Sequence, residues 1–190
     1  SEQGFPDVES CSEEILAITI QDYTTKEITT WGVKPFNNKQ DNVTYHCCNT
    51  EENLLRTFIN YWMQDVPDVI TGWNIQLYDM PYICKRINRV LGEKIMKRMS
   101  PWGLVSEGEV YINGRKNTTF DIGGVTQLDY LDLYKKFTYK AQESYRLDYI
   151  AKVELGQQKL DHSEFDTFKE FYSKGWQKFI EYNIIDVELV

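Results

Sequence analysis

The sequence has few of the features that mark membrane, secreted or zinc-binding proteins. No stretch approaches 18 consecutive apolar residues and no basic region precedes an apolar core, so we expect neither a membrane span nor a signal peptide. The four cysteines form no CxxC pair, so we expect reduced thiols. His46 lies beside Cys47 and Cys48, but adjacent strand residues point to opposite faces and the other ligands of a tetrahedral zinc site are missing. These absences predict a cytosolic protein.

Positive charge is also scarce, with 21 Lys and Arg against 29 Asp and Glu and a net charge of −8. Phosphate binding depends on Lys and Arg that displace counterions, so this balance argues against a surface that coats nucleic acid broadly. It leaves open a small acidic site that holds metal ions and meets phosphate through them. Aromatic residues, in contrast, are abundant at 14%, and can serve core packing or base stacking.

The length of 190 residues fits one domain, and the first third of the chain is β-rich. Apolar patterning predicts strands in 14–23 and 27–34, joined by a polar turn, and a short third strand in 43–48. A helix is expected over 49–65, with Asn49 or Thr50 as its N-cap. Its apolar face is made by Leu54, Leu55, Phe58, Ile59 and Trp62.

The rest of the chain alternates between strand and helix patterns. Asn113-Gly114 between β-rich flanks predicts a tight hairpin over 107–122. The other expected elements are a short buried strand in 68–74, a helix that begins at Pro81, a strand over 125–137, a short helix over 144–155 and a helix over 175–190. This order implies an α/β domain with a mixed sheet.

Two groups of residues could carry chemistry. Asn74 is followed by Asp79, which stands where a helix begins, and a carboxylate there is favoured by the helix dipole. Tyr182 and Asp186 lie four apart on a helix, so they share a face, and a phenol beside a carboxylate can position a metal-bound water. Taken singly, each group is better explained by an ordinary structural role, with Asp79 as a helix cap and Tyr182 and Asp186 as surface residues.

Together, the two groups form an ordered pattern. NIQLYD fits Asn-x-x-x-aromatic-Asp, and YNIID fits Tyr-x-x-x-Asp about a hundred residues later. The chain resembles family B DNA polymerases of the T-even-type bacteriophage branch, in which these are the second and third motifs of a DnaQ-like 3′→5′ exonuclease. The resemblance covers nearly the whole chain, through DVITGWNIQLYDMPYICKRINRVLGEKIMKRMSP, LDYLDLYKKF, SYRLDYIA and YNIIDVE.

This resemblance implies a ribonuclease H-like mixed β-sheet flanked by helices, with an inserted β-hairpin. Residues 1–190 would form a single proofreading domain that is part of a larger DNA polymerase. Its reaction would be hydrolysis of the 3′-terminal phosphodiester of single-stranded DNA with two Mg²⁺ or Mn²⁺ ions. The implied partners are the 3′ end of single-stranded DNA and the remaining polymerase domains, with no membrane, and the implied location of a phage-encoded protein is the host cytoplasm.

The resemblance also assigns roles to single residues. Asp79 and Asp186 would be metal ligands, Tyr182 would orient the attacking water, and Asn74 would help to seat the substrate strand. Three further nucleic-acid contacts are implied: Phe5 stacking on the terminal base, Lys159 near the scissile phosphate, and the Asn113-Gly114 hairpin parting primer from template.

The family's first motif is an Asp-x-Glu pair on a buried central strand, and Asp7-Val8-Glu9 matches only its letters. Polar residues, Gly4 and Pro6 precede it, so we expect a loop, and the family's register places the true motif before Ser1. On this interpretation the first, central strand is missing from this chain. The site would then lack two of its four carboxylates and show negligible activity, and two unpaired strand edges could lead to self-association or to capture of another segment.

Two alternatives stay open from the sequence. The domain could be a non-catalytic DNA-binding or interaction module that keeps the fold. It could also be a free-standing nuclease in which Asp7 and Glu9 are genuine ligands.

Overall fold

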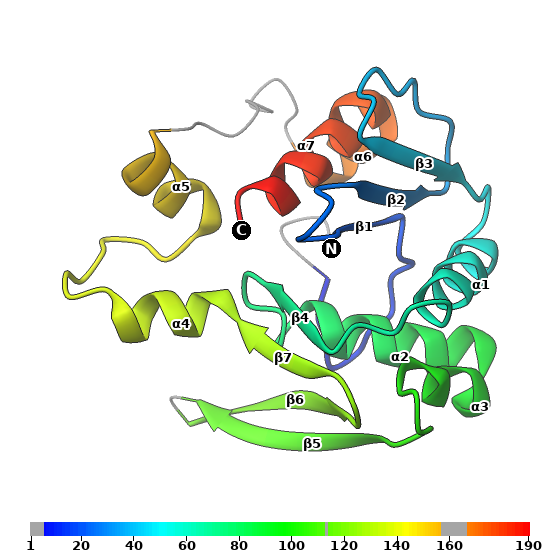
Figure 1. Cartoon of the computed structure of the whole chain (residues 1–190), viewed down its shortest axis with the longest axis horizontal. Helices are drawn as coiled ribbons and strands as arrows, with labels where there is room; N and C mark the ends of the chain where they lie inside the picture. Colours follow the sequence, from blue (N-terminus) through cyan, green and yellow to red (C-terminus); the bar gives the residue numbers. More distant parts are fainter. Residues whose placement is uncertain (1–5, 113, 157–166) are drawn as a thin grey trace.

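The computed structural model describes residues 6–112, 114–156 and 167–190, so Phe5, Asn113 and Lys159 of the predicted site lie outside the described residues. The fold is mixed α/β, with three small sheets and helices around them (Figure 1). The strands are β1 Ala17–Gln21, β2 Ile28–Gly32, β3 Val43–Cys47, β4 Val69–Gly72, β5 Val105–Ile112, β6 Arg115–Ile122 and β7 Thr126–Asp129. The α-helices are α1 Glu51–Trp62, α2 Asp79–Leu91, α3 Glu93–Met96, α4 Tyr130–Phe137, α5 Leu147–Leu155, α6 Phe168–Lys174 and α7 Trp176–Glu188, and a 3₁₀ turn spans Lys97–Met99.

The first three strands form one sheet in the order β1-β2-β3, as their β-rich sequences predicted. β1 pairs antiparallel with β2, and β2 pairs parallel with β3. Successive residues of β2 point to opposite faces, so Ile28 and Trp31, three apart, lie on different sides: Trp31 belongs to the core cluster that includes α1 and α2, and Ile28 to the cluster around α6 and α7. The sheet is therefore covered by helices on its two faces (Figure 1).

The second sheet consists of β4 and β7, which run parallel with Gly72 opposite Asp129. The prediction of a buried strand here was wrong, because Val69 is 51% exposed and the other residues of β4 are at most half-buried. Within the described residues β4 pairs with β7 alone, so its other edge has no strand beside it, and Val69 and Thr71 are exposed. The apolar pair Val69 and Ile70 was interpreted as part of a strand buried within a sheet.

The segment 125–137 was predicted as one strand, and this prediction was wrong for its second half. β7 ends at Asp129, where α4 begins. The Asp129 carboxylate accepts a hydrogen bond from the backbone N–H of Leu131, at 3.0 Å, which caps the new helix. The sequence signal for this helix is Asp129, a helix-capping residue, but it lies inside an apolar run that is also typical of a strand.

The hairpin was predicted correctly as β5 and β6, paired antiparallel with Ile112 opposite Arg115. Gly114 in its turn has φ of 75°, a left-handed conformation that glycine adopts without strain. The inner residues of β6, Thr118, Phe120 and Ile122, are buried, and β6 packs against α2. The hairpin is therefore attached to the helix that begins at Asp79.

Three predicted helices are confirmed as α1, α5 and α7, and α6 was not predicted. Thr50 is the N-cap of α1, where its side chain accepts from the N–H of Asn53. The helix expected from Pro81 begins two residues earlier, at Asp79, which places Pro81 in its first turn, where its missing N–H costs nothing. In the described part of the chain no helix is long and apolar enough to cross a membrane.

Side chains of α2 hold the segment that precedes β1. Tyr82 donates through its hydroxyl to the Glu13 carbonyl at 2.7 Å, and Arg86 and Arg89 donate to the Cys11 carbonyl. Arg86 also forms a buried ion pair with Glu51, the first residue of α1. This ion pair joins α1 to α2 and fixes the orientation of α2.

Candidate active site

A turn between β4 and α2 carries Asn74 and Asp79. Asn74 has φ of 64°, a left-handed conformation that asparagine tolerates better than most residues. Its carbonyl accepts from the N–H groups of Leu77 and Tyr78, at 3.3 and 3.1 Å. The buried carboxylate of Asp129 accepts from the N–H of Asn74 at 3.0 Å and from that of Gln76 at 3.1 Å. Asp129 therefore fixes the turn that presents Asp79.

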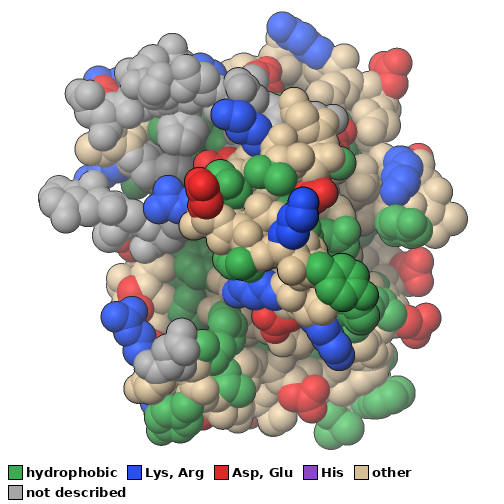
Figure 2. Space-filling view, turned by 90° about the vertical axis from the view of Figure 1, so that its left-hand side faces the viewer, with side chains coloured by type: hydrophobic (Ala, Val, Ile, Leu, Met, Phe, Trp, Pro, Cys, Tyr) green, Lys and Arg blue, Asp and Glu red, His purple; other side chains and the backbone are tan. Residues whose placement is uncertain are grey.

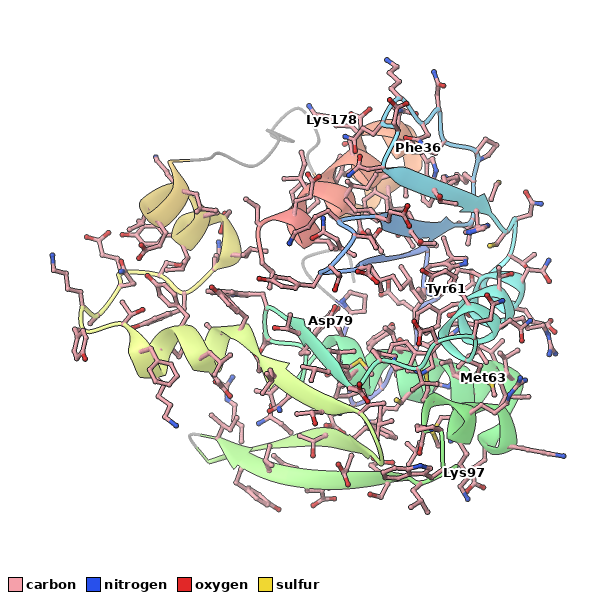
Figure 3. All side chains as sticks on the ribbon, in the orientation of Figure 1. Phe36, Tyr61, Met63, Asp79, Lys97 and Lys178 are labelled. Carbon is pink, nitrogen blue, oxygen red and sulfur yellow. The ribbon has the colours of Figure 1, made fainter. Side chains whose placement is uncertain are left out.

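Asp79 is the first residue of α2 and is labelled near β4 in Figure 3. Its pKa is raised to about 6, chiefly by desolvation and further by the charges of Asp129 and Asp186. The residue is nevertheless exposed to solvent. A carboxylate that is reachable by solvent and faces other acids is suited to bind a cation.

The second predicted group lies on α7. Phe179, Ile180 and Ile184 are buried and anchor this helix against the first sheet. Tyr182 is half-buried, and its ring packs edge-on against Phe171 at 5.9 Å between centroids. Asp186 is half-buried one turn further along the helix, and its charge acts on Asp79.

The charges of Asp129 on β7 and of Asp186 on α7 both act on Asp79 on α2. Asp129 accepts three backbone N–H groups, including that of Leu131, so we do not count it among the candidate metal ligands. Asp79 and Asp186 offer the hard oxygen donors that Mg²⁺ and Mn²⁺ prefer. Within residues 6–112, 114–156 and 167–190 no group of three or more His, Cys, Asp or Glu has the geometry of a metal site.

Asp7 and Glu9 lie in a turn, as expected, and each has a local partner. Asp7 accepts from the N–H of Ser10 at 2.7 Å, which lowers the pKa of its carboxyl group. Glu9 accepts from the hydroxyl of Thr118 at 2.7 Å, which is the main cause of its lowered pKa, and it pairs with Lys85. The charges that act on Asp79 are those of Asp129 and Asp186, not of these two residues.

The hairpin lies next to the turn that carries Asp79. An open hollow of about 430 Å³ is lined by Leu77 from the turn and by Ile112, Arg115 and Asn117 from the hairpin. Gly114 is exposed at the adjoining hairpin turn. An exposed guanidinium beside an apolar wall can contact a phosphate and a base at once.

Sequence reasoning missed Asp129 and an aromatic cluster beside Asn74. Trp73 packs against Tyr130 and Tyr134, with ring centroids 6.2 and 5.9 Å apart, and donates through its indole N–H to the carbonyl of Tyr145. Asp129 could have been found as an N-cap residue before YLDLYKK. No local pattern marks the cluster, because its members come from separate segments.

Comparisons with known proteins identify the family of this chain. The family model for the exonuclease domain of family B DNA polymerases matches residues 1–150. The DNA-directed DNA polymerase of Enterobacteria phage T4 is 39% identical over 150 residues, which is 79% of this chain and 16% of that protein. The DNA-directed DNA polymerase of Escherichia phage RB69 is 36% identical over 147 residues, 77% of this chain and 16% of that protein.

A more distant relative extends over more of the chain. The DNA polymerase catalytic subunit of human herpesvirus 6A is 28% identical over 183 residues, 90% of this chain and 18% of that protein. The chain thus spans less than a fifth of the length of these relatives. The match over residues 1–150 and the identity to the phage enzymes show that the chain belongs to the family of exonuclease domains of family B DNA polymerases.

Proposed function

We propose that this chain is a 3′→5′ proofreading exonuclease domain that removes the terminal nucleotide from single-stranded DNA. The observation that carries the proposal is electrostatic: the pKa of Asp79 on α2 is raised chiefly by desolvation and further by the charges of Asp129 and of Asp186, which lies on α7 over a hundred residues away in sequence. Folding brings two like charges together at a cost, and a cation between them offsets that cost.

In this proposal Asp79 and Asp186 hold divalent cations, Mg²⁺ or Mn²⁺. Two such ions, when bound, activate a water molecule and stabilise the leaving oxygen. Tyr182, one turn before Asp186, orients the water, and Asn74 seats the substrate strand at the start of the turn that Asp129 fixes. Phe5 and Lys159, which lie outside the described residues, would contact the terminal base and the scissile phosphate.

The hairpin residues Asn113 and Gly114 are proposed to separate primer from template. The hollow between the hairpin and Leu77 supports this role, because a strand that is parted at the hairpin can enter beside the turn that carries Asp79.

The domain is further proposed to comprise residues 1–190 and to have a ribonuclease H-like sheet. β1 lies at the edge of the first sheet and β4 at an edge of the second. A central strand with an Asp-x-Glu pair would join these edges and complete the set of ligands. In the whole polymerase the other domains would contact these surfaces, and in their absence the edges of β1 and β4 favour self-association.

These 190 residues by themselves are proposed to cleave DNA negligibly, whereas the parent polymerase is active in the host cytoplasm. Mg²⁺ gives up its hydration water reluctantly and is held through carboxylates, so two of them provide weak binding.

Metal binding tests the proposal directly. Titration of the purified chain with Mn²⁺, followed by calorimetry, should show binding that weakens at least about tenfold in Asp79→Asn and in Asp186→Asn, since even the loss of an outer partner of a metal site costs ~10–100-fold. Asp121→Asn, on the exposed face of β6, is the matched control and should bind as the unmodified chain does. Equal affinity in all four proteins would contradict the assignment.

A cleavage assay separates the alternatives. In the parent polymerase, Asp79→Asn and Asp186→Asn should abolish the shortening of a 5′-labelled oligonucleotide, and Asp7→Asn with Glu9→Gln should leave it unchanged. Loss of cleavage in the latter variant would instead favour the nuclease built on Asp7 and Glu9. Binding of DNA without metal binding would favour the non-catalytic module.

A further inference from the structure

The end of α4 and the loop after it form an exposed basic and aromatic surface, consisting of Lys135, Lys136, Phe137, Tyr139 and Lys140. Phe137 is 68% exposed and Tyr139 is fully exposed at 104%. Figure 2 views the side of the molecule that includes α4 and α5, and shows Lys and Arg, acidic and hydrophobic side chains mixed on this face. Large exposed rings are costly in water, so a run of them beside cations marks a contact surface.

The charge of this surface is opposite to that of the whole chain, which carries −8. Between residues 135 and 146 the sequence has four Lys and Arg and one acid, Glu143. In the described part of the protein none of the three lysines takes part in an ion pair with an acid. Two of them lie over rings instead: the Nζ of Lys135 is 5.2 Å from the ring centroid of Tyr145, and that of Lys136 is 5.7 Å from that of Phe137.

A continuous set of contacts joins this surface to the candidate site. Trp73 precedes Asn74 in the chain and packs against Tyr134, one residue before Lys135. Tyr134 in turn packs edge-on against Tyr145, at 6.4 Å. The indole N–H of Trp73 donates to the Tyr145 carbonyl at 3.0 Å. The basic surface is therefore held in a fixed position relative to the turn that ends at Asp79.

We propose that this surface binds the single-stranded DNA that leads to the site, with the lysines on phosphates and with Phe137 and Tyr139 stacked on bases. This inference rests on the proposed function, which identifies the bound strand as the single-stranded DNA that the site cleaves. The contacts of this surface with DNA need no metal ion. Cations without acidic partners beside exposed rings match a polymer in which phosphates alternate with bases, because the lysines can contact the phosphates and the rings can stack on the bases.

Fluorescence anisotropy of a labelled 12-nucleotide oligothymidine, titrated with the purified chain in EDTA, tests the inference. The variant Lys135→Gln, Lys136→Gln, Lys140→Gln should weaken binding about tenfold or more at low salt. It should also lower the slope of log affinity against log salt by about 2, because each phosphate contact on a single strand contributes ~0.7. Phe137→Ala with Tyr139→Ala should weaken binding at least about fivefold with little change in the salt slope.

A matched control removes the same charge elsewhere, with Lys26→Gln, Lys39→Gln and Lys94→Gln, all exposed. This control should lose affinity only slightly, and the circular dichroism spectra of all the variants should equal that of the unmodified chain. Equal losses in the two triple variants, or no binding by the unmodified chain, would overturn the inference. So would a triple variant at α4 that keeps its DNA affinity but no longer binds the remaining polymerase domains, since the surface would then be a protein interface.

Because the assay contains no metal, its result is independent of the ligand set. Asp79→Asn should bind the oligonucleotide as well as the unmodified chain does or better, since it removes a negative charge. Failure of the proposed function would appear in the Mn²⁺ titration, and failure of this surface in the anisotropy.

Discussion

The two long helices α1 and α2 each begin with an acidic residue, and the surroundings of these two carboxylates are opposite. Glu51 opens α1, is buried, and accepts from the N–H of Ile15 at 2.8 Å and from Nε of Arg86 at 2.7 Å. Asp79 opens α2, is exposed, and has Asp129 and Asp186 as its charged neighbours. A carboxylate at the start of a helix stabilises the fold where a buried Arg side chain pairs with it, as Arg86 does with Glu51. Where the neighbouring charges are acidic, as at Asp79, the carboxylate is suited to bind a cation instead.

The largest expected effect comes from breaking the buried pair. Glu51→Ala leaves the Arg86 guanidinium buried without its partner, so the free energy of unfolding should fall by about 3–5 kcal/mol. Urea denaturation followed by tryptophan fluorescence measures it. The control is Arg56→Ala, which breaks an exposed pair with Glu52 and should cost about 0.3–0.5 kcal/mol. A comparable loss in the two variants would show that the burial of Glu51 and Arg86 has no special weight.

The second expected effect is a loss of stability when Asp129 is replaced, since Asp129 fixes the turn that carries Asp79 but is not a candidate metal ligand. Asp129→Ala leaves the N–H groups of Asn74, Gln76 and Leu131 without their acceptor and should cost about 2–3 kcal/mol. Hydrogen exchange should then show faster opening of residues 74–78. Asp132→Ala, an exposed residue in the first turn of α4, is the control and should lower the free energy of unfolding by only a few tenths of a kcal/mol. Unchanged exchange in the turn would refute the role of Asp129.

The smallest effect has the opposite sign. The folded state binds a proton at Asp79 more tightly than the unfolded state does, so stability without metal should fall as the pH rises from 3.8 to about 6 and stay lower above that range. Asp79→Asn removes this loss and should raise the free energy of unfolding near pH 8 by on the order of 1 kcal/mol, a value discounted because the side chain is exposed to water.

The comparison of pH profiles checks this expectation. Denaturation of the unmodified chain, of Asp79→Asn and of Asp121→Asn at several pH values between about 4 and 8 should give a flatter profile for Asp79→Asn alone. Three parallel profiles would mean that Asp186 and the surrounding protein do not act on Asp79 as described.

The sequence by itself determined the local elements with strong periodicity and the residues of the two motifs. The apolar spacing and the Thr50 cap specified α1, and Asn113-Gly114 specified the hairpin, because these signals act within a few residues. The strand that was expected through 125–137 failed at Asp129, whose capping role competes with the apolar pattern.

Only the tertiary structure decided how the acids divide their tasks. It brought Asp129 and Asp186 near enough for their charges to act on Asp79. It also placed the Asp129 carboxylate where it accepts hydrogen bonds from three backbone N–H groups. It also brought the rings of Trp73, Tyr134 and Tyr145 into contact, with Lys135 of α4 over the ring of Tyr145. The physical reason is that the electrostatic surroundings of a side chain, and its hydrogen-bond partners beyond one helical turn, depend on chain segments that are remote in sequence.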